Sequence, residues 1–161
     1  FAKAVSNGAV PLGGVLASDA VHAALMQAPP QAIELFHGYT YSGHPLASAA
    51  GLATLDLYAR DGLFARATEL GRYWEDAAHS LMGRRHVIDI RTIGLVAGIE
   101  LEPRPGAPTA RAMELFHAAF DTGLLVRATG DIIALSPPLI VEKAQIDEMF
   151  GKLGDLLARI D

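Results

Sequence analysis

The sequence has 161 residues, of which 51% are hydrophobic and 19% are charged, and its formal net charge at pH 7 is −5. A negative net charge without a cluster of Lys and Arg argues against a nucleic-acid-binding surface, and the absence of cysteine excludes disulfides and thiolate metal sites. No apolar run reaches the roughly 18 residues of a membrane-spanning helix. We expect a cytoplasmic protein. Its high apolar content indicates an extensive subunit or domain interface.

The first 62 residues predict one strand and two helices separated by turn residues. An apolar run bounded by Gly and Pro indicates a buried strand, a Ser-Asp pair indicates a helix N-cap, and a proline suits the first turn of a helix. In chain order the expected elements are a turn at 7–8, a strand at 11–17, a helix from 19 to about 27 and an Ala-rich helix from 45 to about 60. No strand precedes residue 11 that could pair with the expected one. We therefore expect the sequence to be the C-terminal part of a longer polypeptide.

From residue 63 onward, expected helices alternate with pairs of short strands. Apolar residues recur at helical spacing in three stretches, which predicts amphipathic helices. The expected elements are a helix at 63–82, strands at 87–91 and 95–101, a helix at 112–119, strands at 124–127 and 132–135, and a helix at 146–160. This order predicts an α+β unit in which helices cover one side of a small sheet.

A single lysine, Lys3, stands near the start of the chain among apolar and small residues, with no carboxylate close in sequence. Such a lysine is poorly solvated, which disfavours its charged form and leaves a nucleophilic amine. Enzymes that form Schiff bases use an amine of this kind. The alternative is a surface lysine whose stem covers an apolar patch.

A second motif, Phe36-His37-Gly38-Tyr39-Thr40-Tyr41-Ser42-Gly43-His44-Pro45, contains Thr40, 37 residues after Lys3. A hydroxyl and the backbone amides of a Gly-containing loop are suited to phosphate oxygens, and the alternative for Thr40 is an ordinary loop hydroxyl. His37 and His44 have no Asp, Glu or Cys nearby, so we expect no metal site. We expect both histidines to order the loop through hydrogen bonds.

A third motif, Leu124-Leu125-Val126-Arg127-Ala128-Thr129-Gly130-Asp131 followed by an apolar strand and Ser136-Pro137-Pro138-Leu139, contains Arg127. A guanidinium is always charged and forms a planar, two-pronged contact with a carboxylate. The alternative for Arg127 is an ion pair with Asp131 across the turn. Arg91 also follows a strand, but Asp89 beside it favours a structural ion pair.

Together these three motifs resemble class III aminotransferases, which depend on pyridoxal 5′-phosphate (PLP), and within that class the branch that acts on ω-amino acids or on β-alanine and pyruvate. The resemblance implies the α/β PLP-dependent transferase fold of type I. It implies that Lys3 forms the Schiff base with PLP and is the catalytic base, that Thr40 binds the cofactor phosphate across a dimer interface, and that Arg127 receives a substrate carboxylate. It also implies that residues 1–50 end the large PLP-binding domain and that residues 51–161 form the small C-terminal domain.

The resemblance further implies a cytoplasmic homodimer or dimer of dimers that moves an amino group from an ω-amino acid, such as β-alanine, or an amine to pyruvate. In the family, the aspartate partner of the pyridine nitrogen, a Gly-Ser phosphate turn and a ring-stacking aromatic lie upstream of the lysine, so we expect the 161 residues alone to be inactive. Two alternatives stay open. One is a class III enzyme of acetylornithine, 4-aminobutyrate or diaminopelargonate type, and the other is a non-catalytic dimerisation remnant of the same fold.

Overall fold

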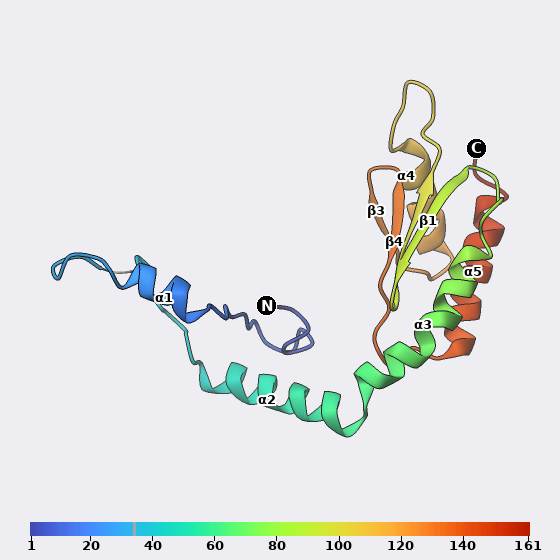
Figure 1. The fold of residues 1–161 in the computed structure, drawn as a ribbon. Helices are drawn as coiled ribbons and strands as arrows, with labels where there is room; N and C mark the ends of the chain where they lie inside the picture. Colours follow the sequence, from blue (N-terminus) through green and yellow to red (C-terminus); the bar gives the residue numbers. More distant parts are fainter. Residues whose placement is uncertain (34) are drawn as a thin grey trace. The chain divides into compact units, whose positions relative to one another are not determined.

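The computed structural model describes residues 1–33 and 35–161, which form two compact units, Phe1–Asp61 and Gly62–Asp161. Figure 1 shows the order of the elements along the chain. Among the described residues, none of the helices combines the length and apolar character needed to cross a membrane. The division into a large-domain segment 1–50 and a small domain 51–161 stays a prediction.

The first unit contains both expected helices, α1 (Asp19–Leu25) and α2 (Pro45–Arg60). Ser18 caps α1 by accepting a hydrogen bond from the Val21 backbone N–H at 3.4 Å, and Pro45 lies in the first turn of α2, where its missing N–H costs nothing. Both sequence signals are confirmed, and α1 ends two residues earlier than expected. The α2 helix buries only Ala47, Gly51 and Thr54, so most of its apolar surface is exposed in this chain.

The strand expected over 11–17 is wrong for this chain. The segment joins the residues before it only through an isolated antiparallel bridge between Ala2 and Gly13, with backbone hydrogen bonds of 2.8 and 2.9 Å between Phe1 and Gly14. Val15 and Leu16 are 89% and 90% exposed. A buried strand requires a neighbouring strand along its length, and the described residues place no such neighbour beside this segment.

The second unit contains a four-stranded sheet made of β1 (Val87–Ile93), β2 (Val96–Leu101), β3 (Arg127–Thr129) and β4 (Ile132–Leu135). The strand order is β1-β2-β4-β3, and every neighbouring pair is antiparallel. Four strands were expected here, and four are present. The expected third strand, at 124–127, ended at Arg127, whereas β3 begins at Arg127. The register pairs Arg127 with Ala134, so a longer β3 would run opposite Ser136 and Pro137, and proline lacks the N–H that a ladder needs.

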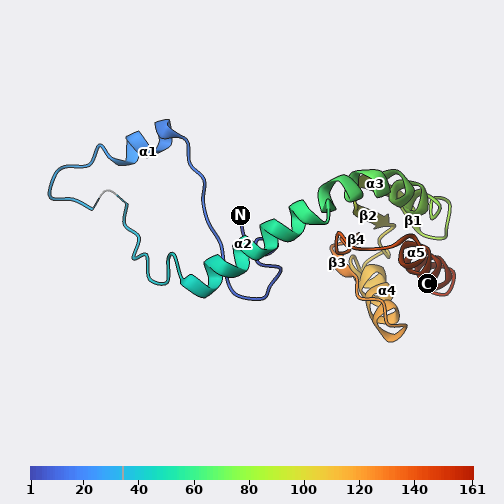
Figure 2. The ribbon, with the colours of Figure 1, turned by 90° about the horizontal axis from the view of Figure 1, so that it is seen from below.

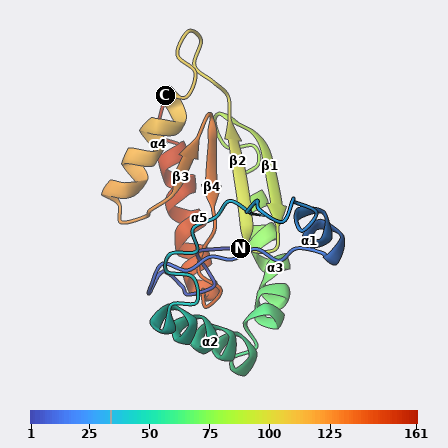
Figure 3. The same ribbon diagram turned by 90° about the vertical axis from the view of Figure 1, so that its left-hand side faces the viewer.

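Three helices, α3 (Leu63–His79), α4 (Ala110–Asp121) and α5 (Lys143–Leu157), lie on one side of this sheet, as Figures 1 and 3 show. Side chains on the covered face are buried, and Ile99 pairs there with Ile133, both at most 1% exposed. On the other face Val96 and Ile93 are 45% and 78% exposed. The predicted one-sided α+β arrangement is therefore confirmed, and Figure 2 shows the same helices from below.

Three arginines from separate segments bind the residues that follow α5. Arg104 donates through Nε and Nη2 to the Asp161 main-chain oxygen at 3.1 and 2.7 Å, and Arg111 donates through Nε to the same oxygen at 2.9 Å. Arg85 donates to the Ile160 carbonyl at 3.2 Å. Arg111 is only 5% exposed, so its charge is buried against the main chain, where a charge-assisted hydrogen bond is stronger than a neutral one.

Candidate functional site

Lys3 lies at the start of a tight turn that Ser6 organises. The Lys3 carbonyl accepts the Ser6 backbone N–H at 3.2 Å, and the Ser6 hydroxyl donates to the Val10 carbonyl at 2.6 Å. Ser6 is 2% exposed. Asn7 and Gly8 have φ values of 49° and 76°, a left-handed conformation that both residue types adopt at low cost. The expected Asn-Gly turn is confirmed.

Lys3 itself differs from the sequence expectation in one respect. Its side chain is exposed in this chain, so the expectation of a poorly solvated lysine is wrong for the described residues. The reason is the same as for the missing strand, since no described segment covers the Lys3 side chain. Lys3 also has a left-handed φ of 62°, which is uncommon for a residue with a long side chain and marks a constrained position.

Two further residues hold this turn, and neither was singled out from the sequence. Tyr58 of α2 donates its hydroxyl to the Ala4 carbonyl at 2.8 Å, one residue after Lys3. Gly51 of α2 faces the turn so closely that a Cβ there would lie 2.9 Å from Leu12 Cδ2 and 3.7 Å from the Val5 carbonyl oxygen. The only sequence signal for either is their spacing of seven residues, which places them on one face of a helix.

Thr40 lies in a loop of irregular backbone that leads into α2. Tyr39 and Tyr41 on either side have left-handed φ values of 50° and 66°. The His37 Nδ1 atom accepts the Tyr39 backbone N–H at 3.0 Å, which confirms the expectation that His37 orders the loop. His44 instead makes a ring contact with Tyr41, with centroids 6.1 Å apart, and its side chain makes no capping hydrogen bond to α2.

The lysine segment and the Thr40 loop meet within the first unit. A pocket of about 300 Å³ is lined by Val10 and Pro11 from the first segment and by Tyr41 and His44 from the second, with two residues of α2 closing it. The structure thus brings the two motifs together, although they are separated by more than twenty residues of chain. Lys3 and Thr40 do not line this pocket.

Arg127 lies at the beginning of β3, on the sheet face opposite the one that α3, α4 and α5 cover. Its register partner on β4 is Ala134, whose partner on β2 is Gly98, and Gly98 pairs in turn with Arg91 on β1. The small residues between the two arginines leave the surface beside Arg127 open. Arg127 also lines a groove of about 600 Å³ together with apolar residues, among them Val96, Leu125 and Pro137.

The alternative reading of Arg127 as an ion-pair partner of Asp131 is wrong. The Asp131 carboxylate accepts the Thr109 backbone N–H at 2.7 Å, and within residues 1–33 and 35–161 Arg127 forms no ion pair. The expected ion pair between Arg91 and Asp89 is confirmed, and Arg91 also contacts Glu100 at 2.6 Å. The hydrogen bonds that Arg91 donates to Glu100, and to a smaller extent to Asp89, raise the pKa of Arg91 above its usual value. Of the two arginines on this face, only Arg127 is left without a charged partner among the described residues.

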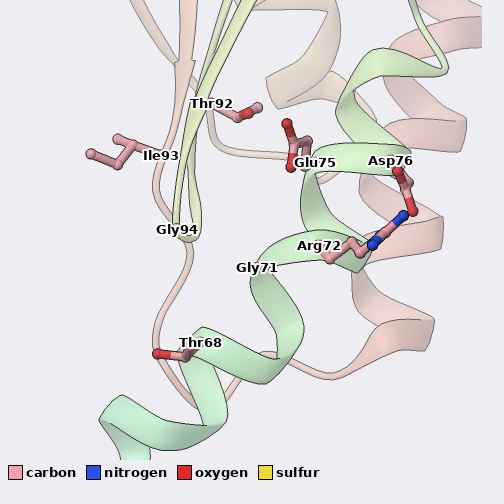
Figure 4. A pocket seen from close by; sticks show the side chains of 8 residues that line it. All are labelled: Thr68, Gly71, Arg72, Glu75, Asp76, Thr92, Ile93 and Gly94. Carbon is pink, nitrogen blue, oxygen red and sulfur yellow. The ribbon is translucent and has the colours of Figure 1, made fainter.

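A separate groove of about 590 Å³ lies between α3 and the turn that joins β1 to β2. Figure 4 shows Arg72 extending along α3 toward Asp76, while Glu75 lies closer to Thr92 and Ile93 points away from the groove. Charges of both signs line it, and none of the three candidate residues does. It therefore offers no single-signed site for a charged ligand.

The three candidate side chains together offer a primary amine, a hydroxyl and a guanidinium. In the described part of the chain, neither the Lys3 amine nor the Thr40 hydroxyl forms a hydrogen bond or ion pair. Both groups are therefore available to a ligand, and their chemistry fits PLP, because an amine condenses with an aldehyde and a hydroxyl donates to a phosphate. Lys3 and Thr40 belong to the first unit and Arg127 to the second.

Comparison with known proteins assigns this set of residues to a family. The family described as aminotransferase class-III matches residues 1–157. An omega-aminotransferase of Caulobacter vibrioides is 62% identical over 161 residues, which are the whole of this chain and 37% of that protein. A beta-alanine–pyruvate aminotransferase of Pseudomonas aeruginosa is 42% identical over 158 residues, which are 97% of this chain and 35% of that protein.

Solved structures agree with these relatives. An amine transaminase from an uncultivated Pseudomonas species, described as PLP-bound, superposes with a TM-score of 0.86 at 31% identity and covers 99% of this chain and 38% of its own. An (S)-enantioselective omega-transaminase from Thermomicrobium roseum superposes with a TM-score of 0.85 at 33% identity and covers 98% of this chain and 36% of its own. These matches confirm the expected α/β fold of PLP-dependent transaminases, present here in part.

The chain thus spans little more than a third of the length of the curated relatives it matches. Within that third, the family match over residues 1–157 and the fold agree. The chain belongs to the class III aminotransferases.

Proposed function

We propose that this chain is part of an aminotransferase that moves an amino group from an ω-amino acid, such as β-alanine, or from an amine to pyruvate. The observation that carries the proposal is the family match over residues 1–157 together with relatives named for ω-amino acids and β-alanine. The availability of the Lys3 amine in a constrained turn supports it. A class III enzyme with another donor, such as the diaminobutyrate transaminase that is 33% identical, is the alternative.

Lys3 has two roles in the proposed reaction. Its amine holds the cofactor aldehyde covalently, and when the donor amine takes its place, the free Lys3 amine is the base that removes the proton from the donor carbon that carries nitrogen. The same amine would then deliver that proton to the cofactor carbon that carried the aldehyde, and in the second half of the cycle it would carry out both proton transfers in reverse. PLP, when bound, supplies the electron sink that makes this proton acidic.

Thr40 and Arg127 bind rather than react. The Thr40 hydroxyl donates a hydrogen bond to the cofactor phosphate, and the adjoining loop amides add partial positive charge. The Arg127 guanidinium binds the carboxylate of β-alanine or pyruvate, and it is free to do so because Asp131 is occupied by Thr109. A donor without a carboxylate needs no such contact, so the open surface beside Arg127 suits amines as well.

We further propose a cytoplasmic homodimer, or a dimer of dimers, with the active site at the subunit interface. The first unit exposes large apolar side chains, including Val15, Leu16, Phe36, Leu52 and Tyr41, which the rest of the polypeptide or a partner subunit has to cover. Exposed apolar surface of this extent marks an interaction surface. Residues 1–50 would then belong to the large cofactor-binding domain and residues 51–161 to the small domain. The 161 residues alone are expected to be inactive.

Borohydride reduction of the full-length enzyme with PLP tests the central role of Lys3. Reduction makes the lysine–cofactor link permanent, and peptide mapping then shows which lysine carries it. This chain has three lysines, and the other two are engaged elsewhere, since Lys143 lies over the Tyr73 ring and Lys152 pairs with Glu148. A label on Lys3, lost together with transamination in Lys3→Ala, is expected. A label on Lys143 or Lys152 would overturn the assignment.

A further inference from the structure

Asp131 joins three elements of the second unit that are far apart in sequence. Its main-chain carbonyl accepts the N–H of Leu101, the last residue of β2, at 2.9 Å. Its carboxylate accepts the N–H of Thr109, which precedes α4, at 2.7 Å. Asp131 itself lies in the two-residue turn between β3 and β4, next to Gly130, whose φ is 59°. The turn that follows Arg127 by three residues is therefore tied to both the sheet and a helix.

The contact with Thr109 meets a local need of α4. Thr109 is the N-cap of α4 but has a left-handed backbone, with φ 69° and ψ −18°, and its side chain makes no capping hydrogen bond. Left-handed backbone is unfavourable for a β-branched residue, so another contact has to hold it in place. A carboxylate at a helix N-terminus interacts favourably with the helix dipole, and the Asp131 bond to the Thr109 N–H is charge-assisted.

Arg127, in contrast, has little that fixes its position. It begins β3, which is a strand of three residues at the edge of the sheet and pairs only with β4. Its side chain is exposed and forms no ion pair with any described residue. The direction in which Arg127 projects therefore depends on how firmly the β3–β4 turn is held, and Asp131 makes the side-chain contact that holds it.

We propose that Asp131 is a positioning residue for carboxylate recognition by Arg127. It anchors the hairpin through Thr109, and in doing so it withholds its own carboxylate from Arg127, so the guanidinium stays available for a substrate carboxylate. This inference rests on the proposed role of Arg127. It predicts that changes at Asp131 affect donors that carry a carboxylate and spare donors that do not.

The test uses the full-length enzyme with PLP and compares two amino donors, β-alanine and 1-phenylethylamine. The half-reaction with each donor is measured in the absence of pyruvate, and the half-reaction with saturating pyruvate is measured separately. The variants are Arg127→Ala, Asp131→Ala, Asp131→Asn and the Arg127→Ala/Asp131→Ala double variant. Tyr73→Phe is the control, because it removes a side-chain hydrogen bond of the same unit, to Asp147 at 2.5 Å, on α3 and α5. All rates come from single-turnover half-reactions, normalised to bound PLP.

Asp131→Ala is expected to lower the single-turnover rate with subsaturating β-alanine about tenfold, while the rate with 1-phenylethylamine stays within about twofold. Misplacing a substrate-positioning group by about 1 Å can cost up to about 100-fold, and a partial displacement costs less. Asp131→Asn keeps an oxygen that can accept the Thr109 N–H, so it should recover most of the loss. In the Arg127→Ala background, Asp131→Ala should add nothing to the donor ratio. If Asp131→Ala yields no PLP-bound protein, Asp131→Glu, which displaces the carboxylate by one methylene, is expected to show the same selective loss.

The outcomes separate this inference from the proposed function. An unchanged donor ratio in Arg127→Ala would refute the carboxylate role of Arg127. A selective loss in Arg127→Ala, but an equal loss for both donors in Asp131→Ala, would leave that role intact and overturn the positioning role of Asp131. An Asn variant as defective as the Ala variant would also overturn it, because the hydrogen bond to Thr109 would then not be what matters.

Discussion

Replacing Leu153 with alanine should destabilise the second unit strongly. Leu153 lies on α5 and is fully buried, at 0% exposed, in the cluster of apolar side chains between the sheet and the helices. Truncating a buried leucine removes its transfer free energy and leaves a cavity, which together cost about 2–5 kcal/mol. Because this site is surrounded by regular helices and strands that cannot easily collapse, we expect a loss near the middle of that range, about 3 kcal/mol.

Leu125→Ala is the matched control for the same chemical change. Leu125 is 76% exposed, so only about a quarter of the 1.5–3 kcal/mol that full burial of a leucine contributes is at stake, which is below about 1 kcal/mol. The expected difference between the two variants is therefore about 2 kcal/mol or more. Both substitutions remove identical atoms, so the difference isolates burial.

Urea unfolding of the 161-residue chain, followed by tryptophan fluorescence, measures this difference. The chain has one tryptophan, Trp74. It is 0% exposed, and its ring meets the Phe150 ring edge-on with centroids 5.0 Å apart, so the signal reports the second unit alone. With slopes of about 1–3 kcal/mol per molar urea, Leu153→Ala should lower the midpoint by about 1 M or more. Equal midpoints for the two variants would refute the assignment of Leu153 to the core.

Three further predictions address α5, the α3–α5 contact and the cofactor. Gly151→Ala should stabilise the second unit by about 0.5–1 kcal/mol, because a Cβ at this position of α5 would meet nothing within 4 Å. Gly154→Ala should stabilise it less in the same urea assay, because its Cβ would lie 3.4 Å from a Leu81 methyl group. The hydrogen bond to Asp147 raises the pKa of Tyr73 above 10.0. The stabilisation that this hydrogen bond gives the folded unit is thus present below pH 10 and lost as pH rises through the pKa of Tyr73 in the folded state. Tyr73→Phe should remove that alkaline step from a plot of the urea midpoint against pH. Thr40→Ala in the full-length enzyme should weaken PLP retention by about tenfold or more, the equivalent of a charge-assisted hydrogen bond, with activity restored by added PLP; unchanged PLP affinity on equilibrium dialysis would return Thr40 to an ordinary loop hydroxyl.

The second unit could be predicted well because its elements bury their apolar faces within the chain. Leu70, Trp74 and Ala78 of α3 lie in the core cluster, so the spacing of apolar residues alone indicated this helix. The strand expected over 11–17 failed for the opposite reason. Its apolar run records burial against partners that the described residues do not supply, and a sequence pattern does not say where the partner comes from.

The candidate site likewise has residues that the sequence could indicate and a contact that it could not. Lys3, Thr40 and Arg127 could be named because each sits in a motif of adjacent residues. The true partner of Asp131 could not, because it depends on a left-handed Thr109 that is 22 residues away. Neither spacing nor charge indicates that pairing, and charge alone favours the nearer Arg127. The roles of the three candidate residues themselves stay predictions.

The arginines that bind the residues after α5 change how this end of the helix should open and close. The last turn of a helix normally frays, and its amide protons exchange with water quickly, because few contacts oppose local opening. Here the Arg159 and Ile160 amides bond to the Leu156 carbonyl at 2.9 and 3.1 Å, and Ile160 is 3% exposed. Opening this turn would also break the bonds from Arg104 and Arg111. Its amide hydrogens should therefore exchange about as slowly as those in the middle of the helix, so that the end of α5 opens only when the whole unit unfolds.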